Sequence, residues 1–161
     1  MLDLKFFDIT NTVKEGILGY SKQIKDLSIF TISAACQNET VQASLEFDCK
    51  PYFVIHLSSD NNQVDKSLMV KEVERIVKLG GRNFICPPFL IDAFRNSFGN
   101  EITLMTPGVR NNSQPNDHSA AIDARTARAL GTDHIVVGRP IYNSNQPNKI
   151  AKEYYDQFIS I

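Results

Sequence analysis

Six short apolar runs, separated by segments of helical character, constrain most strongly what this sequence can fold into. The runs are rich in β-branched and aromatic residues, which favour strands. They are LDLKFF at the start of the chain and the segments at 28–33, 52–57, 83–86, 102–105 and 134–137. Strands that alternate with helices through short connections predict a parallel sheet covered by helices. The sequence therefore predicts an α/β fold, in a chain of 161 residues that suits a single domain over 1–161.

The segments between the runs carry the spacing and the end signals of helices. The clearest, at 65–81, repeats apolar residues along one helix face, with Asp65 or Ser67 as its N-cap and two glycines at its end. A second helix is expected after Asp123, which can cap it. The last helix carries one apolar stripe, formed by Ile150, Tyr154 and Phe158.

Two parallel architectures fit this alternation, an open doubly wound sheet and a (β/α)8 barrel. An open sheet would need a Gly-rich phosphate turn after its first strand, and FDITNT is not such a turn. In a barrel, inward side chains near the carboxyl ends of the strands line the active site. The charged residues of the first strand would then point into the mouth of the barrel. We therefore expect a partial (β/α)8 TIM barrel, with six of the eight βα units present.

Composition excludes several classes of protein. The net charge of −1, with lysines and arginines scattered along the chain, gives no footprint for nucleic acid. The sequence has neither an apolar run of membrane-spanning length nor a secretory leader, so we expect a cytoplasmic protein with no membrane partner. The three cysteines lack C-x-x-C spacing, and we expect reduced core thiols at Cys36, Cys49 and Cys86.

The first strand holds the first candidate for chemistry, the pattern D-x-K-x-x-D formed by Asp3, Lys5 and Asp8. In a regular strand Asp3 and Lys5 share one face, and the apolar residues around them share the other. One ammonium between two carboxylates would be held charged and fixed in direction, which suits a proton donor. The alternative is a half-exposed edge strand whose charged face meets water.

Two later strands each end near an arginine. TPGVR presents Arg110, and VVGRPI presents Gly138 and Arg139, where glycine admits a ligand close to the backbone and the guanidinium suits phosphate. The alternative is a strand-ending turn with a solvated arginine. At another strand end, Ser58 or Ser59 of LSS can contact the polar edge of a ring or cap the following helix.

These four motifs, DLKFFDITNT, LSS, TPGVR and VVGRPI in this order, resemble the orotidine 5'-phosphate decarboxylase family. The resemblance runs through all 161 residues and implies strands 3 to 8 of the family's (β/α)8 barrel. It implies a lyase of pyrimidine biosynthesis that converts orotidine monophosphate to uridine monophosphate and carbon dioxide, with no metal and no organic cofactor.

The resemblance also assigns roles at the first strand. Lys5 would protonate the carbanion left at C6 when carbon dioxide departs, and Asp3 would lie beside the carboxylate of the substrate. Asp8 would reach across a homodimer interface into the partner's site. Ile9 and Thr12 would line that shared site.

Further along the chain, the resemblance implies contacts with the nucleotide. Ser58 or Ser59 would contact the pyrimidine. Gly138 and Arg139 would grip the phosphate, and Arg110 would also contact the ligand. These positions imply a small-molecule nucleotide as substrate.

Two departures from the family pattern bear on activity. Where the family has a glutamine and an arginine in the loop after its seventh strand, this chain has His118, which can donate to a phosphate, and Ala120, with Gln114 as a displaced substitute. The family's first two strands, with an aspartate and a second active-site lysine, have no counterpart here. We therefore expect a truncated chain with little or no decarboxylase activity alone.

Four alternatives stay open. The chain can be one half of a split enzyme that needs a complementing amino-terminal fragment, or a non-catalytic remnant that keeps the fold. It can be a related sugar-phosphate aldolase or decarboxylase that uses magnesium, although TPGVR and LSS speak against this. It can also be a binding module for a nucleotide monophosphate.

Overall fold

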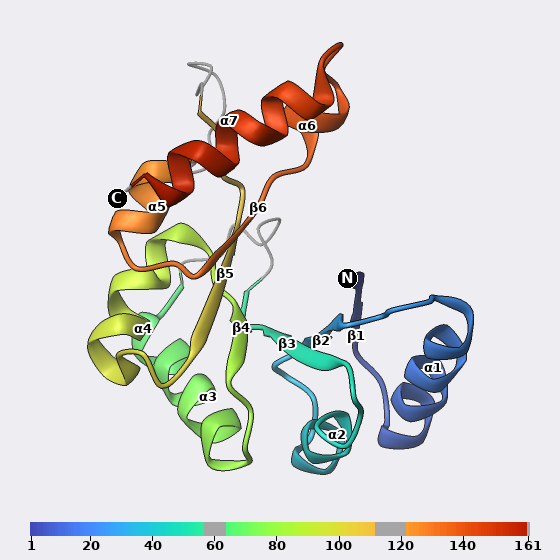
Figure 1. Cartoon of the computed structure of the whole chain (residues 1–161). Helices are drawn as coiled ribbons and strands as arrows, with labels where there is room; N and C mark the ends of the chain where they lie inside the picture. The colour runs from blue at the N-terminus through green and yellow to red at the C-terminus, as the bar shows by residue number, and fades with distance from the viewer. Residues whose placement is uncertain (57–63, 112–121, 161) are drawn as a thin grey trace. The chain divides into compact units, whose positions relative to one another are not determined.

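The computed structural model describes residues 1–56, 64–111 and 122–160, and in these ranges strands and helices alternate (Figure 1). The strand order follows the chain, β1-β2-β3-β4-β5-β6. The strands are β1 (Leu2–Phe6), β2 (Ile29–Ser33), β3 (Lys50–Val54), β4 (Asn83–Ile85), β5 (Thr103–Pro107) and β6 (His134–Val136). The helices are α1 (Thr10–Gln23), α2 (Asn38–Ser44), α3 (Lys66–Lys78), the 3₁₀ turn η1 (Pro88–Leu90), α4 (Ile91–Phe98), α5 (Ala124–Ala129), α6 (Arg139–Tyr142) and α7 (Pro147–Ile159).

The predicted parallel α/β fold is confirmed. The pairs β1–β2, β2–β3 and β5–β6 are parallel, as expected when a helix connects each strand to the next. The chain divides into two compact units, residues 1–84 and 85–161, and the expectation of one domain stays a prediction. No helix within the described ranges is long and apolar enough to cross a membrane.

The first unit buries apolar residues from its helices and its strands. Val13 and Ile17 lie one turn apart on α1 and are fully buried, as are the aromatic rings of Phe30 and Phe53. The predicted cap of α3 is confirmed, because the Asp65 carboxylate accepts the backbone N–H of Ser67 at 2.8 Å. Burial of this apolar surface stabilises the unit in proportion to the area removed from water.

Two glycines end α3 for different reasons. Gly80 has a φ of +106°, in the left-handed region that a residue with a side chain rarely adopts. Gly81 is buried, and a Cβ at this position would collide with the side chains of Ile76 and Phe53. The Gly-Gly stop predicted from the sequence is therefore both a turn and a close packing contact.

The second unit has a core formed between α5, α7 and the residues that follow β5 and β6. Val109, Ala124, Ala127 and Tyr154 are buried together. Half-buried Ile135, Val137, Ile150 and Phe158 pack against them. The predicted stripe on the last helix is confirmed, and it packs on the final strand through this cluster.

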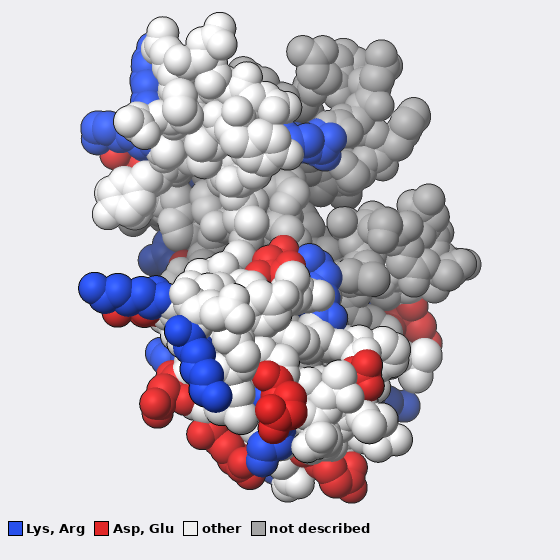
Figure 2. All heavy atoms as spheres, turned by 90° about the vertical axis from the view of Figure 1, so that its right-hand side faces the viewer, with Lys and Arg blue, Asp and Glu red and all other residues white. Residues whose placement is uncertain are grey.

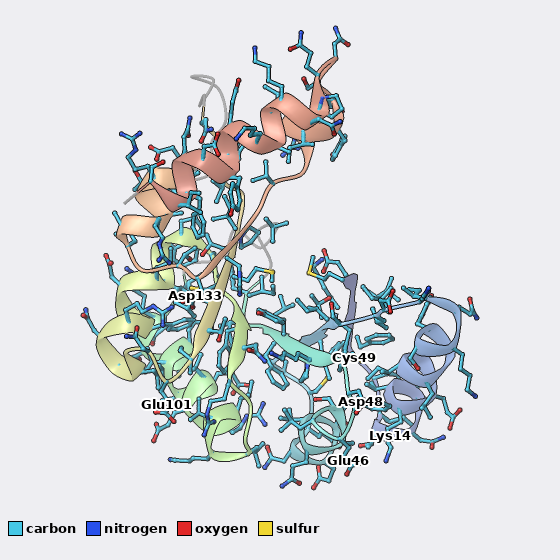
Figure 3. All side chains as sticks on the ribbon, in the orientation of Figure 1. Lys14, Glu46, Asp48, Cys49, Glu101 and Asp133 are labelled. Carbon is cyan, nitrogen blue, oxygen red and sulfur yellow. The ribbon has the colours of Figure 1, made fainter. Side chains whose placement is uncertain are left out.

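The side chain of Arg95 forms hydrogen bonds with several turns of the second unit. The guanidinium of Arg95, on α4, donates to the carbonyl oxygens of Gly99, Ile102 and Gly131 and pairs with Asp133 at 2.6 Å. Asp133, labelled in Figure 3, also accepts the backbone N–H of Leu104 at 2.7 Å. A guanidinium provides five donors in a fixed plane, which suits it to several carbonyl groups at once.

The prediction of a regular first strand with a buried apolar face is wrong at Leu4. This side chain is 48% exposed. The register explains the difference, because Leu2 lies opposite Phe30 whereas Phe6 lies opposite Ile32, so that four steps along β1 match two along β2. Such a bulge breaks the alternation of side chains between the two faces of a sheet.

The cysteines are free and buried, as predicted. Burial raises the pKa of each of the thiols of Cys36, Cys49 and Cys86 above its ordinary value. A raised pKa keeps a thiol protonated and poorly nucleophilic at neutral pH. These cysteines therefore serve as small apolar residues of the core.

Candidate active site

Asp3 and Lys5 form a close ion pair on β1, as the sequence predicts. The Lys5 Nζ lies 2.9 Å from each carboxylate oxygen of Asp3. The two side chains are 41% and 48% exposed. Lys5 has a φ of +52°, in the left-handed region that is costly for a residue with a side chain. Backbone strain of this kind clusters at functional sites, and here it falls on the candidate proton donor.

Asp8 does not complete the predicted network. Its Oδ1 accepts the backbone N–H of the adjacent Ile9 at 2.7 Å, and the ammonium of Lys5 contacts Asp3 alone among the described residues. The structure therefore does not place the ammonium of Lys5 between Asp3 and Asp8 of the same chain, and the assignment of Asp8 to a partner's site stays a prediction. The reason is local, since Asp8 follows the strand and its carboxylate turns to the backbone at the start of α1.

Ile9 and Thr12 lie at the start of α1. Ile9 is the N-cap residue, with a side chain that is 68% exposed, and Thr12 is exposed in the first turn. Between them, the Thr10 hydroxyl lies 2.9 Å from that of Thr40 and joins α1 to α2. The exposed positions are available to a further molecule, whereas Thr10 is committed to the fold.

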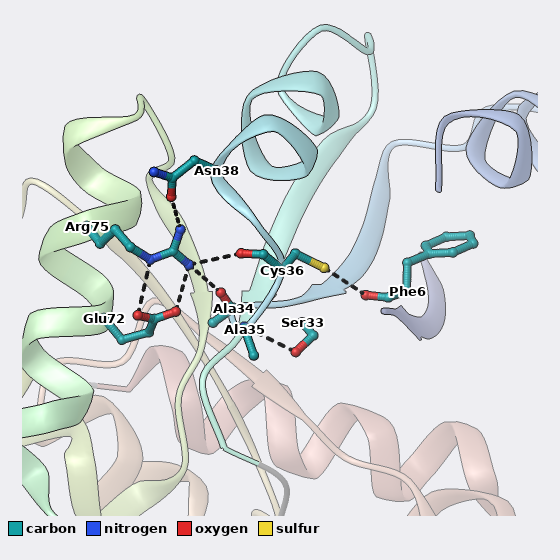
Figure 4. Close-up of polar contacts among 8 residues, drawn as sticks. All are labelled: Phe6, Ser33, Ala34, Ala35, Cys36, Asn38, Glu72 and Arg75. Atoms are coloured by element: carbon teal, nitrogen blue, oxygen red, sulfur yellow. Dashed lines mark hydrogen bonds and ion pairs between the residues drawn. The ribbon is translucent and has the colours of Figure 1, made fainter. Parts of the chain in front are cut away.

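Arg75 is a residue that the sequence did not single out. Its guanidinium, on α3, donates to the carbonyl oxygens of Ala34, at 2.6 Å, and Cys36, at 3.2 Å, and to the side chain of Asn38 (Figure 4). Glu72 on the same helix pairs with it at 2.7 Å. The arginine thus fixes the loop that leaves the carboxyl end of β2. No sequence motif indicated this contact, because the partners are about forty positions apart in the chain.

The same loop reaches β1 through Cys36. The thiol of Cys36 donates to the carbonyl oxygen of Phe6 at 3.7 Å (Figure 4). Phe6 directly follows Lys5, so the loop held by Arg75 supports the strand that carries the ion pair. The thiol donor is weak, and its main effect is to define how the two segments pack.

Arg110 and Arg139 occupy equivalent places in the second unit. Pro107 and Val136 are register partners at the ends of the parallel strands β5 and β6, and each arginine comes three residues later. Chains that leave neighbouring parallel strands do so at the same edge of the sheet. The two predicted ligand-contacting arginines therefore follow the same edge of this strand pair.

The backbone around these arginines is ordered by hydrogen bonds. The N–H of Arg110 donates to the carbonyl oxygen of Ile122 at 2.9 Å, and the N–H of Asn111 donates to the Tyr154 hydroxyl at 3.0 Å. Gly138 is the N-cap residue of α6 and is exposed, and Arg139 is the first residue of that helix. Among the described residues, a Cβ at Gly138 would approach the Tyr142 ring alone, at 3.4 Å, so packing against this part of the chain does not require glycine there.

Asp123 caps α5, and its contribution to the stability of the second unit can be measured. Its carboxylate accepts the backbone N–H of Thr126 at 2.7 Å, and this bond is the main cause of its lowered pKa. The pKa of Asp123 is lower in the folded state than in the unfolded state. The cap therefore contributes to the free energy of unfolding above the unfolded-state pKa, and this contribution is lost as the pH falls through the folded-state pKa. We expect Asp123→Ala to lose about 1 kcal/mol of unfolding free energy at pH 7.

That loss should shrink below about pH 4, where the wild-type carboxylate takes up a proton. Urea denaturation at pH 7 and at pH 3 measures it. Asp123→Asn is the matched control, since asparagine also caps helices and does not titrate. A constant difference between wild type and Asp123→Ala at both pH values would contradict the assignment.

Three predicted site residues lie outside the described residues. They are Ser58, Ser59 and His118.

The face shown in Figure 2 carries acidic and basic side chains interspersed with one another. The described residues on this face therefore form no extended patch of one sign, in keeping with the scattered charges of the sequence.

Comparison with known proteins identifies the family. The model of the Orotidine 5'-phosphate decarboxylase / HUMPS family matches residues 1–154. An orotidine 5'-phosphate decarboxylase of Wigglesworthia glossinidia brevipalpis is 27% identical over 99% of this chain and 75% of its own length. One of Staphylococcus saprophyticus is 29% identical over 91% of this chain and 70% of its own length.

Solved structures share the fold. The orotidine 5'-phosphate decarboxylase of Lactobacillus acidophilus superimposes with a TM-score of 0.79 at 21% identity, over 98% of this chain and 74% of that one. The orotidine 5'-phosphate decarboxylase of Pyrococcus horikoshii superimposes with a TM-score of 0.76 at 24% identity, over 99% of this chain and 73% of that one. The relatives named here are orotidine 5'-phosphate decarboxylases, and the sugar-phosphate alternative is not favoured. The chain belongs to the Orotidine 5'-phosphate decarboxylase / HUMPS family.

Proposed function

We propose that this chain carries out the decarboxylation of orotidine monophosphate, with Lys5 as the proton donor. The observation that carries the proposal is the ion pair of Lys5 with Asp3, in which the ammonium lies 2.9 Å from both carboxylate oxygens within the D-x-K-x-x-D segment. The membership of the family supports it. The pair supplies a positioned acid and a fixed negative charge, which are the two groups that this reaction needs.

The reaction balances with these groups alone. The bond from C6 of the pyrimidine to the carboxylate carbon breaks, its electron pair stays on C6, and carbon dioxide leaves. The Lys5 ammonium gives a proton to C6, which forms uridine monophosphate, and the neutral amine then regains a proton from water. Asp3 would lie beside the carboxylate of the substrate, where the repulsion between like charges is relieved when carbon dioxide departs.

Remote binding of the phosphate supports the chemical step. We assign Gly138 and Arg139 to the phosphate, since the guanidinium is a planar double donor and the glycine is exposed. Arg110, at the same edge of the β5–β6 pair, contacts the ligand as well. Binding energy gained at the phosphate can help to stabilise the transition state at the reacting carbon.

The role of Arg139 has a direct test in ligand binding. We expect Arg139→Ala to weaken the binding of uridine monophosphate at least tenfold, because a charge-assisted pair is lost. Isothermal titration calorimetry measures this, with Lys152→Ala as the control. Lys152 pairs with Asp156 on α7 and is not assigned to the ligand. Equal affinity of wild type and Arg139→Ala would remove Arg139 from the phosphate site.

Turnover by this chain requires a partner that covers β1. Asp3 and Lys5 are about half exposed, whereas proton transfer to a carbanion needs a site from which water is excluded. Apolar side chains on the same segment are also exposed, among them Leu4 at 48%, Phe7 at 68% and Ile9 at 68%. The partner is a second copy, which would bring Asp8, Ile9 and Thr12 into a shared site, or a complementing amino-terminal fragment.

A mixing experiment tests the function and the partner together. Release of carbon dioxide from orotidine monophosphate is measured for the chain alone and with an amino-terminal fragment of the Staphylococcus saprophyticus enzyme. Sedimentation velocity reports whether a dimer forms. We expect little turnover from the monomeric chain and a clear gain with the fragment or on dimerisation. No turnover in any mixture would support a non-catalytic remnant, and the binding of uridine monophosphate alone would support a binding module.

A further inference from the structure

A buried threonine lies beneath the Asp3–Lys5 pair. Thr31, on β2, is 1% exposed. Its hydroxyl donates to Oδ1 of Asp3 at 2.9 Å and accepts the backbone N–H of Lys5, also at 2.9 Å. A threonine hydroxyl has one proton to donate and lone pairs to accept, and both functions are used here.

The register of the sheet explains why Lys5 needs this contact. β1 bulges between Leu2 and Phe6, and Lys5 lies in the bulge with a φ of +52°. A bulge leaves residues outside the regular ladder, so their backbone groups need other partners. The side chain of Thr31 supplies the acceptor for the N–H of Lys5.

One hydroxyl thus acts on both members of the ion pair. Oδ1 of Asp3 accepts from Thr31 and from the ammonium of Lys5, both at 2.9 Å. The contact with a buried side chain restricts rotation of the carboxylate, and the contact with the N–H of Lys5 stabilises the backbone from which the lysine side chain projects. The partly exposed Asp3–Lys5 pair is therefore oriented by the buried hydroxyl of Thr31, which is inaccessible to water.

We propose that Thr31 is a positioning residue for proton delivery by Lys5. The inference rests on the proposed decarboxylase function for its catalytic consequence, although the orienting effect itself does not depend on turnover. Thr31 has no contact with substrate in this role. It acts through Asp3 and through the backbone of Lys5, and a loss of its hydroxyl should loosen the ammonium without removing it.

The chain offers an internal reference for this effect. Lys14 on α1 pairs with Glu46 at 3.2 Å in the same unit, and its side chain is 40% exposed, close to the 41% of Lys5 (Figure 3). A general loosening of the unit would mobilise both ammonium groups. A positioning effect of Thr31 would mobilise Lys5 alone.

Two substitutions and one control make the first test. Thr31→Val keeps the shape and removes the hydroxyl, and Thr31→Ser restores it. Thr40→Val is the control, because Thr40 is also 1% exposed and its hydroxyl contacts, among the described residues, that of Thr10 and not the Asp3–Lys5 pair. NMR relaxation of the lysine ammonium groups gives an order parameter for each. We expect the order parameter of Lys5 to fall in Thr31→Val and to recover in Thr31→Ser. The order parameter of Lys14 should not change in either variant, and that of Lys5 should not change in Thr40→Val.

Kinetics provide the second test, in whichever mixture the wild-type chain is active. We expect Thr31→Val to lower kcat about tenfold with KM unchanged, because substrate still binds while the donor is less well placed. Thr31→Ser should recover most of the rate. A mobile Lys5 with unchanged kcat would overturn the positioning role, and so would an unchanged order parameter. If the wild type shows no turnover, the decarboxylase proposal fails, and the order parameters alone decide whether Thr31 orients Lys5.

Discussion

Replacing Lys5 with alanine should reduce decarboxylation by a factor on the order of 10²–10⁴ in every mixture in which the wild-type chain is active. General acid catalysis by a positioned side chain contributes a factor of this size. Lys5→Arg should lose a similar factor, although it keeps the positive charge, because an arginine remains protonated and cannot give up its proton. Steady-state release of carbon dioxide measures both variants.

Two controls separate the loss of a proton donor from other effects. Lys14→Ala removes another ion-paired lysine of the first unit and should leave the rate within about twofold of wild type. The affinity for uridine monophosphate should be unchanged in Lys5→Ala, since Gly138 and Arg139 are assigned to the phosphate. A variant that lacks Lys5 and still decarboxylates at the wild-type rate would remove this residue from the mechanism.

Replacing Arg75 with alanine should cost about 2–4 kcal/mol of unfolding free energy. The substitution removes three hydrogen bonds to the loop after β2 and leaves the carbonyl oxygens of Ala34 and Cys36 without this donor. It also leaves Glu72, 31% exposed, without its partner. Chemical denaturation followed by circular dichroism measures the loss.

The matched control for Arg75 lies one turn further along α3. Lys78 pairs with Glu74 at the surface, and Lys78→Ala should change stability little, since exposed helical pairs contribute weakly. Arg75→Lys should fall between wild type and alanine, because an ammonium cannot reproduce the planar set of donors. An Arg75→Ala variant as stable as Lys78→Ala would show that the loop does not depend on this arginine.

The local signals of the sequence predicted the elements and their ends. The six strands were expected within a few residues of their observed bounds, and the caps by Asp65 and Asp123 were confirmed. These features depend on residues that are close in the chain, where spacing and cap chemistry act directly. The order of the strands followed from the rule that consecutive parallel units lie side by side.

The candidate site was predicted in part. The pair of Asp3 with Lys5 was expected from their spacing and is present. Arg110 and Arg139 follow strand ends as their motifs indicated, and the structure adds that these ends are register partners. The expected contact of Lys5 with Asp8 is absent from the described residues, and Leu4 is exposed. The exposure of Leu4 comes from the bulge of β1, of which the sequence carries no sign, whereas Asp8 lies beyond the strand and its carboxylate accepts the backbone N–H of Ile9.

The sequence by itself determined the alternation of strands and helices and the family, and it predicted Lys5 as the acid and Gly138 and Arg139 as phosphate-binding groups. The tertiary structure alone decided how Lys5 is held. The Thr31 hydroxyl meets Asp3 and Lys5 across 28 and 26 positions of the chain, and Arg75 meets Ala34 across 41. Contacts at such separations depend on strand register and packing, which the spacing of residues along the chain does not specify.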